Sequence, residues 1–361
     1  MSANKSMLKA MPKIDLHLHL LGGFSLQSLW HLSQKYQPNL DKKAFDQIFD
    51  FNNFEGFQKA WKFKNSLIKT NNDFSFLMDD FVKHLKKENI IYAEPAIALF
   101  ELAPLKPKDL LDISFNKLKS SGIEFSFIMD LIRGDGLKEM TRQYEFYKQY
   151  AQSHQIRGVG LAGNEARHGL NSELAPLFKR AKQECFGITI HAGEKKGGDK
   201  NIILRAINEF GADRIGHAKH HLLHNKELGK NIHLELIPSA QSRWKADSQQ
   251  YQEIGKEVSD YLNAEIYERM FGIDNLPQYS VNINSDDHGM YQTSLTEVME
   301  KTATRISPNN WKTMNIMAIT KSFAPEKIKQ KLFQEIDKFD YHQNQKLSRV
   351  VKPEKPNQKS H

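Results

Sequence analysis

The sequence predicts an α/β protein, a (β/α)₈ TIM barrel with extra helices between its first and second strands. Its 361 residues suit one barrel domain with insertions, and we find neither an internal repeat nor support for a second domain. Short apolar or β-branched runs alternate with longer amphipathic stretches, which is the order expected when crossover helices join parallel strands. Eight such runs can be placed, as a closed barrel of this kind requires.

The expected strands are short, and the expected helices lie between them. The strands are residues 13–17, 90–95, 124–131, 158–162, 187–191, 214–217, 233–237 and 281–284. Helical patterns between them include residues 74–87, 109–120, 137–152 and 174–184. We therefore expect one barrel domain over residues 1–350.

Residues 42–70 form an insertion that is too long for an ordinary loop between a strand and its helix. Aromatic side chains gather there, at Phe51, Phe54, Phe57, Trp61 and Phe63. One interpretation is a lid over the mouth of the barrel. The other is an amphipathic helix packed on the barrel, and the sequence leaves both open.

Composition argues against several classes of function. The net charge is +8, but the lysines are spread over many expected helix faces without interleaved aromatic residues, so we expect no nucleic-acid partner. No apolar run approaches the roughly 20 residues that cross a bilayer. The first residues also lack the apolar segment of a signal peptide. We expect a cytoplasmic protein without a membrane partner.

Two local features concern the tail and the cysteine. Residues 351–361 are polar and basic and contain two prolines, so they bury too little to offset their ordering entropy and we expect a disordered tail. The only cysteine, Cys185, cannot form an intramolecular disulfide. Its apolar surroundings, CFGITI, predict a buried side chain.

Residues with metal-binding side chains lie at the ends of several expected strands. His17 and His19 end the first run as HLH, and residues two apart on a strand point to the same face. His191 follows FGITI, His217 closes RIGH, and Asp286 follows VNINS. Because the carboxyl ends of parallel barrel strands meet at one mouth, we expect these residues to share a site.

The residue types in this set favour zinc. Imidazole and carboxylate groups are suitable zinc ligands, and a chain with one cysteine cannot supply a structural thiolate site. A bound zinc ion lowers the pKa of water from about 15.7 toward 7. The expected ligands of one zinc ion per chain are His17, His19, His191 and Asp286.

Two further carboxylates lie close to these ligands in the sequence. Glu194, three residues after His191, either exchanges a proton with a reacting ring or stabilises a helix N-terminus. Asp286 and Asp287 would repel each other in a dry pocket unless a metal ion bound the first. Asp287 would then bind a substrate nitrogen or support a histidine ligand.

In their order along the chain, these motifs resemble the adenosine deaminase family. The matching segments are MPKIDLHLHLLGG, VGLAGNE, HAGE, RIGHA, VNINSDDHGMYQTSLTEVME and KSF. The resemblance implies zinc-dependent hydrolytic deamination of adenosine or a related 6-aminopurine nucleoside, which gives an inosine-type product and ammonia. It implies a small-molecule purine partner and no organic cofactor, and it leaves the oligomeric state open.

The resemblance also implies roles for individual residues. Glu194 would protonate N1 of the purine, while His217 would orient and help deprotonate the attacking water. Asp287 and the backbone N–H of Gly163 would fix the edge of the ring. His19 and Leu21 would lie beside the substrate as well.

The chain departs from the family pattern on the sugar side of the expected pocket. Family members usually carry an acidic or amide residue at Leu21, a proline at His288 and an acidic residue at Gly160, and the proline–serine motif at 237–240 is a looser match. Leucine cannot bind the ribose 5′-hydroxyl, so we expect adenosine to be a mediocre substrate and apolar 5′ groups to do better. Alternatively, Leu21 only repacks the wall, or a nearby lysine or His288 reads a 5′-phosphate.

Several alternatives stay open at this point. The substrate could be a 5′-modified adenosine, adenine or an N6-modified AMP. The protein could instead be a different metal-dependent amidohydrolase. It could also be a non-catalytic binding protein on the same barrel, although loss of activity would be expected to strike the metal ligands or Glu194 first, and all are present.

Overall fold

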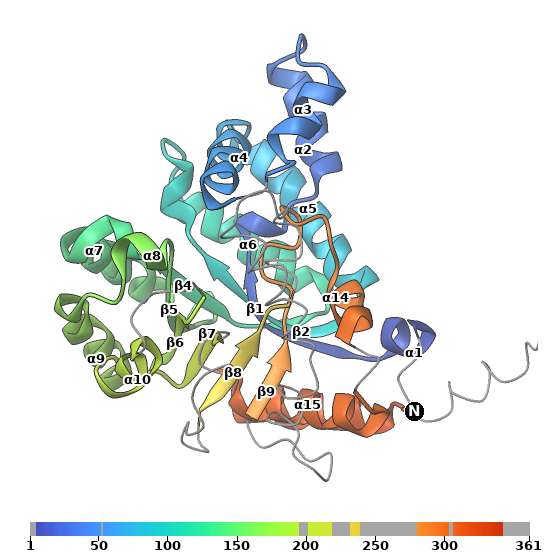
Figure 1. Ribbon diagram of the computed structural model, residues 1–361, viewed down its shortest axis with the longest axis vertical. Helices are drawn as coiled ribbons and strands as arrows, with labels where there is room; N and C mark the ends of the chain where they lie inside the picture. Colours follow the sequence, from blue (N-terminus) through green and yellow to red (C-terminus); the bar gives the residue numbers. More distant parts are fainter. Residues whose placement is uncertain are drawn as a thin grey trace, which may run out of the picture.

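A parallel sheet that curves into a nearly closed barrel forms the centre of the molecule (Figure 1). The computed structural model describes residues 5–51, 53–194, 201–218, 232–238, 280–302 and 306–341. The strands follow the order β1-β2-β4-β5-β6-β7-β8-β9, and the short β3 pairs with β2. The N–H of Asp286 donates to the carbonyl of His17 at 2.9 Å, which joins the segment after β9 back to β1. The predicted (β/α)₈ barrel is confirmed.

The strands lie close to their predicted positions. They are β1 (Lys13–His19), β2 (Ile90–Ile97), β3 (Glu124–Phe125), β4 (Phe127–Ile132), β5 (Ile156–Ala162), β6 (Gly187–Ala192), β7 (Arg214–His217), β8 (His233–Leu236) and β9 (Ser280–Ile283). The third predicted run, 124–131, is divided at Ser126 into β3 and β4. Every residue of β1 is buried, as expected of a parallel strand covered on both faces.

Helices surround the sheet and extend one end of the barrel. Those nearest the predictions are α5 (Asn71–Lys87), α6 (Pro107–Ser121), α7 (Gly136–Tyr150) and α9 (Ala175–Gln183). The others are α1 (Lys5–Ala10), α2 (Leu26–Tyr36), α3 (Lys42–Ile48), α4 (Phe54–Ser66), α8 (Glu165–His168), α10 (Ile202–Asn208), α14 (Leu295–Thr302), α15 (Pro308–Lys321) and α16 (Glu326–Lys338). Short 3₁₀ turns are η1 (Leu21–Gly23), η2 (Leu99–Leu102), η3 (Arg133–Asp135) and η4 (Ser172–Leu174).

Helix α5 illustrates why these segments are helical. The Thr70 side chain accepts from the N–H of Asp73, whose own side chain accepts from the N–H of Thr70, so a capping box satisfies the first turn. Phe74, Leu77 and Phe81 follow at helical spacing and are fully buried. The helix therefore packs one apolar face against the rest of the hydrophobic core.

The extra helices between β1 and β2 lie at the end of the barrel where enzymes of this architecture have their active sites. Figure 1 shows α2, α3 and α4 beyond the end of the barrel toward which the β8 and β9 arrows point. That end is where the carboxyl ends of the strands and the loops after them form a site. The insertion therefore stands where it can line a pocket.

A buried ion network ties the barrel strands to the KSF segment. The Arg214 guanidinium contacts Glu94 Oε2 and Glu235 Oε1, each at 2.6 Å. The ring of Phe323 lies 3.8 Å from the same guanidinium. A Cβ atom on Gly187 would lie 2.1 Å from that ring, so the neighbouring strand needs glycine there.

Two sequence predictions have different outcomes here. The prediction that Cys185 is buried is wrong: its side chain is exposed in the turn between α9 and β6, where its φ of 67° ends the helix before the strand begins. The predicted tail, 351–361, lies outside the described residues. Among the residues that are described, no helix is long and apolar enough to cross a membrane.

Candidate active site

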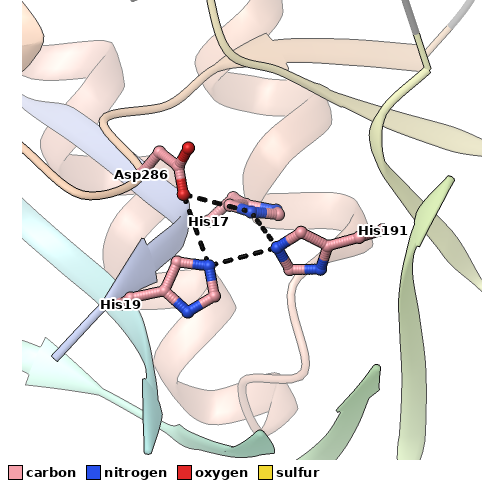
Figure 2. A group of neighbouring side chains, drawn as sticks. All are labelled: His17, His19, His191 and Asp286. Carbon is pink, nitrogen blue, oxygen red and sulfur yellow. Dashed lines mark hydrogen bonds and ion pairs between the residues drawn. The ribbon is translucent and has the colours of Figure 1, made fainter. Parts of the chain in front are cut away.

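Four predicted metal ligands meet at the end of the barrel (Figure 2). His17 and His19 come from β1, His191 from β6, and Asp286 from the segment after β9. One ligand atom from each lies within 4.8 Å of the others. All four side chains are largely buried. The group can therefore hold one metal ion.

The distances within the group fit a cation. His191 Nε2 lies 3.0 Å from His17 Nε2 and 3.1 Å from His19 Nε2, and Asp286 Oδ1 lies 3.3 Å from His19 Nε2. A neutral imidazole carries only one N–H, so three ring nitrogens cannot all donate to one another. A cation between them satisfies every lone pair at once.

Two buried carboxylates orient the histidines on β1. Glu235 Oε2 lies 2.6 Å from His17 Nδ1, and Asp130 Oδ2 lies 2.8 Å from His19 Nδ1. When each Nδ1–H donates to its carboxylate, the Nε2 lone pair faces the cluster, which is the usual support of a metal-bound histidine. We did not predict either residue, although each is the only acidic side chain in its strand.

The backbone around the cluster is held in sparsely populated conformations. His217 has a φ of 67° and Asp286 a φ of 56°, in the left-handed region that most side chains avoid. A Cβ atom on Gly216 would lie 2.5 Å from His17 Cε1, so the ring of His17 requires a glycine on β7. Strained backbone of this kind is common at functional sites.

Glu194 lies just beyond β6 and lines the same cavity as the metal cluster. The turn that carries it is fixed by Glu165, whose Oε2 accepts from the N–H of Gly193 at 2.9 Å and from that of Glu194 at 3.4 Å. Arg133 donates to the carbonyl of His191 at the end of β6, just before this turn. The Glu194 side chain is therefore presented by a rigid segment.

Asp287 lines the cavity, and its carboxylate packs closely against Gly22. Its Oδ1 is buried and has no hydrogen-bond partner within the described part of the chain. Burial and the neighbouring Asp286 carboxylate raise the pKa of Asp287 to about 8. The contacts to the β1 histidines go to Glu235 and Asp130 instead, so the alternative that Asp287 supports a histidine does not hold for those two ligands.

Burial also sets the charges of the surrounding groups. It lowers the pKa of His217 to about 4 and, together with the neighbouring imidazoles, that of His191 well below its usual range. Burial disfavours the Asp286 carboxylate, yet the hydrogen bond and charge of His19 hold its pKa at about 2. The cluster thus combines a neutral His191 with an ionised Asp286 carboxylate, as metal ligation requires. His19 differs: burial lowers its pKa, but the carboxylates of Asp130 and Asp287 outweigh this effect and raise the pKa well above its usual range, so a metal ion bound there would take the place of a proton.

One cavity of about 260 Å³ is lined by His19, His191 and Asp286 of the cluster and by the other predicted site residues, and His17 lies directly behind it, 3.0 Å from His191. Its polar end is lined by His19, His191, Glu194, His217, Asp130, Asp286 and Asp287. Its remaining wall includes Leu21, Phe54, Phe57, Trp61, Gly163 and Tyr291. The structure therefore brings together all the residues expected at the site, although they are spread from β1 to the segment after β9.

The model of the family described as adenosine deaminase matches residues 12–256, more than half of the chain. The chain belongs to the adenosine deaminase family. It is therefore a metal-dependent aminohydrolase. The expected site residues His17, His19, His191, Glu194 and His217 lie inside the matched range, and Asp286 and Asp287 follow it.

Individual relatives agree with this assignment. An adenosine deaminase of Clostridium perfringens is 24% identical over 341 residues, covering 89% of this chain and 97% of the relative. The solved adenine deaminase from Arthrobacter aurescens has a TM-score of 0.76 at 19% identity, covering 91% of this chain and 99% of that one. A zinc-bound amidohydrolase from Burkholderia ambifaria has a TM-score of 0.75 at 14% identity, covering 94% of both chains.

The residues that depart from the family pattern differ in whether they line the cavity. Leu21 is fully buried and lines the cavity, as expected from its place two residues after His19. His288 does not line the cavity: its ring stacks on His84 with centroids 4.1 Å apart and contacts Phe81. The idea that His288 reads a 5′-phosphate is therefore wrong. Pro238 is described, but the rest of the proline–serine motif, Ser239 and Ala240, lies outside the described residues.

The aromatic insertion forms a packed helix that also lines the cavity, and the interpretation as a lid over the mouth stays a prediction. Helix α4 contributes Phe54, Phe57 and Trp61 to the cavity wall. On its other side, Phe63 packs against the rings of Phe45 and Phe49, as an amphipathic helix would. The insertion is thus packed through its own helices and also forms part of the wall of the cavity.

Proposed function

We propose that this enzyme is a zinc-dependent hydrolytic deaminase of adenosine or a related 6-aminopurine nucleoside. The observation that carries the proposal is the joint placement of the four metal ligands with Glu194, His217 and Asp287 around one cavity of about 260 Å³. That combination provides a metal site, a proton donor and a ring-binding carboxyl group. Hydrolysis would give an inosine-type product and ammonia.

Zinc fits the residues that would hold it. His17, His19, His191 and Asp286 offer nitrogen and oxygen donors, and Glu235 and Asp130 support two of the imidazoles. When bound, zinc lowers the pKa of a water molecule to about 7 and so supplies a nucleophile at neutral pH. The metal-bound relative from Burkholderia ambifaria supports this choice.

The chain's own residues then bind the ring and move protons. Glu194 donates a proton to N1 of the purine, which makes C6 more electrophilic. His217, neutral because burial lowers its pKa to about 4, accepts a proton from the attacking water and passes it to the amino group on C6, which leaves as ammonia. Asp287 and the backbone N–H of Gly163 form hydrogen bonds with the edge of the purine ring. The φ of 97° at Gly163 is a conformation that glycine adopts readily and other residues rarely do. Such preorganised groups supply much of the rate in many enzymes.

A second candidate substrate class follows from Leu21. An apolar wall that faced the ribose 5′-hydroxyl would leave it without a partner, at a cost of roughly 1–3 kcal/mol. The buried position of Leu21 in the cavity wall favours adenosines with an apolar 5′ group, such as 5′-deoxyadenosine or 5′-methylthioadenosine. The competing explanation is that Leu21 only repacks the wall.

The test combines a metal analysis with an ultraviolet assay. We expect about one zinc per chain and loss of the adenosine-type absorbance with at least one member of a panel containing adenosine, its 5′-modified analogues, adenine and N6-modified AMP. Two tightly bound metals, or none after gentle purification, would favour a different amidohydrolase. A zinc-loaded protein that converts no member of the panel would reject the proposed function.

A further inference from the structure

Strands β4 and β5 place a carboxylate beside a residue that has no side chain. Asp130 on β4 and Gly160 on β5 are register partners in the parallel sheet. A Cβ atom built on Gly160 would lie 3.6 Å from Asp130 Oδ1 and 3.2 Å from Ile128 Cγ2. The glycine therefore leaves room for the Asp130 carboxylate, and a larger side chain would compete with it.

The two oxygens of the Asp130 carboxylate have different surroundings. Oδ2 lies 2.8 Å from His19 Nδ1. Oδ1 is buried without a hydrogen-bond partner in the described part of the chain, and Asp130 lines the cavity. Only 3% of the residue is exposed. Burying a charged carboxylate destabilises the folded state unless the charge is paired and hydrogen-bonded, and the contact of Oδ2 with His19 supplies such a partner.

We propose that Asp130 is a positioning residue of the metal site, and that Gly160, by carrying no large side chain, keeps the adjoining space free for this carboxylate. The inference rests on the proposed function in one respect, since it takes the cluster to be a zinc site. It also accounts for the departure at Gly160, where the family usually has an acidic residue: an acid there would meet the Asp130 carboxylate at close range.

The physical role follows from the tautomer of His19. Its Nε2 can bind a metal only if the ring proton is on Nδ1, and an acceptor at 2.8 Å holds the proton there and fixes the plane of the ring. Glu235 does the same for His17 from β8. Without Asp130, His19 would lose this orientation, and loss of such a partner typically weakens metal binding about 10–100-fold.

The test measures zinc affinity by competition with a chelator, a readout that does not depend on the substrate. Asp130→Ala should weaken zinc binding about 10–100-fold. Asp130→Asn should retain most of the affinity, because its amide oxygen still accepts from His19 Nδ1–H. Asp135→Ala is the matched control, since Asp135 lies on the same connection after β4 and bonds Gln143 instead. Circular dichroism checks that each variant is folded.

A double variant tests whether a carboxylate on β5 can replace the one on β4. Asp130→Ala with Gly160→Asp returns an acid to the same space from β5 and should regain part of the lost zinc affinity. Unchanged affinity in Asp130→Ala would overturn the positioning role. A double variant no better than Asp130→Ala would overturn the role of Gly160. Failure of the proposed function would appear separately, as a wild type that binds zinc but converts no aminopurine.

Discussion

The two ends of the cavity are built differently. At the metal end, each catalytic or ligating side chain comes from the carboxyl end of a barrel strand, and buried acids such as Glu235, Asp130 and Glu165 hold its surroundings in place. At the outer end, Leu21 comes from the turn after β1, Phe57 and Trp61 come from the insertion at 42–70, and all three offer mostly apolar surface. Under the proposed function, the barrel would provide the chemistry, and the residues before β2 would provide the surface that selects the rest of the substrate.

The largest effects are expected at the metal end. His17→Ala and Asp286→Ala each remove a ligand from a group whose atoms lie within 4.8 Å of one another, so both variants should lose the metal and all measurable deaminase activity. Elemental analysis and the ultraviolet assay measure the two losses. A variant that kept full metal content would show that the cluster is not the metal site.

Glu194→Gln should separate chemistry from binding at the same end. The amide keeps the shape of the side chain but cannot donate the proton, so turnover should fall by at least about 10², while zinc content and ligand affinity stay close to wild type. Steady-state kinetics and isothermal titration with the product nucleoside measure these quantities. Near-normal turnover would remove Glu194 from the mechanism.

The metal end could be predicted from the sequence because its signals are local. Two histidines two residues apart on a strand share a face, and strand ends in a parallel barrel converge, so His17, His19, His191, His217 and Asp286 follow from position alone. Glu235 and Asp130 were missed because no sequence pattern indicates which residue an acid inside an apolar strand will contact. Each is identified only when the strands are placed side by side.

The outer end could not be predicted to the same depth. Whether Phe57 or Phe63 faces the cavity depends on how α4 rotates against the barrel, which is a matter of tertiary packing. His288 follows the motif acids Asp286 and Asp287 in sequence, yet its ring turns away to stack on His84. The exposed Cys185 was missed for a similar reason, since a residue in a helix-ending turn can point outward even in an apolar run.

Leu21→Asp sharpens the comparison by giving the outer end a polar group. The carboxylate can accept from the ribose 5′-hydroxyl, so the ratio of kcat/KM for adenosine to that for 5′-deoxyadenosine should rise by about 10–100-fold. Leu21→Met is the matched control and should leave the ratio unchanged. A wild type that already prefers adenosine by roughly tenfold or more would contradict the apolar-wall explanation.

Lys64 gives the smallest expected effect, and it tests how apolar the outer end is. Its side chain is fully buried behind the cavity wall, where Nζ donates to the carbonyl of Leu21 at 2.7 Å and lies 3.6 Å from the centre of the Trp61 ring. Burial lowers the pKa of Lys64 to about 7, although the charges of Glu101 and Asp287 oppose this shift. The ammonium form is therefore disfavoured in the folded protein.

The sign of the pH effect follows from proton counts. Between pH 7 and about 10.5, the unfolded chain keeps the proton on Lys64 while the folded protein releases it, so this residue makes the folded state more stable as the pH rises. The free energy of unfolding of wild type minus that of Lys64→Met should accordingly increase from pH 7 to pH 10, as urea titrations at each pH would measure. The contribution of Lys13 is common to both proteins and cancels in the difference. Asp287 has a pKa raised by burial to about 8 and interacts with Lys64, so it is replaced by asparagine in both proteins to remove its titration from the difference. Lys62→Met, which removes an exposed lysine from the same helix, should show the same pH dependence of stability as the wild type.

A difference in unfolding free energy between wild type and Lys64→Met that does not change with pH would contradict the prediction. It would mean that Lys64 stays charged in the folded protein, so that the outer end of the cavity also has a buried charge beside it.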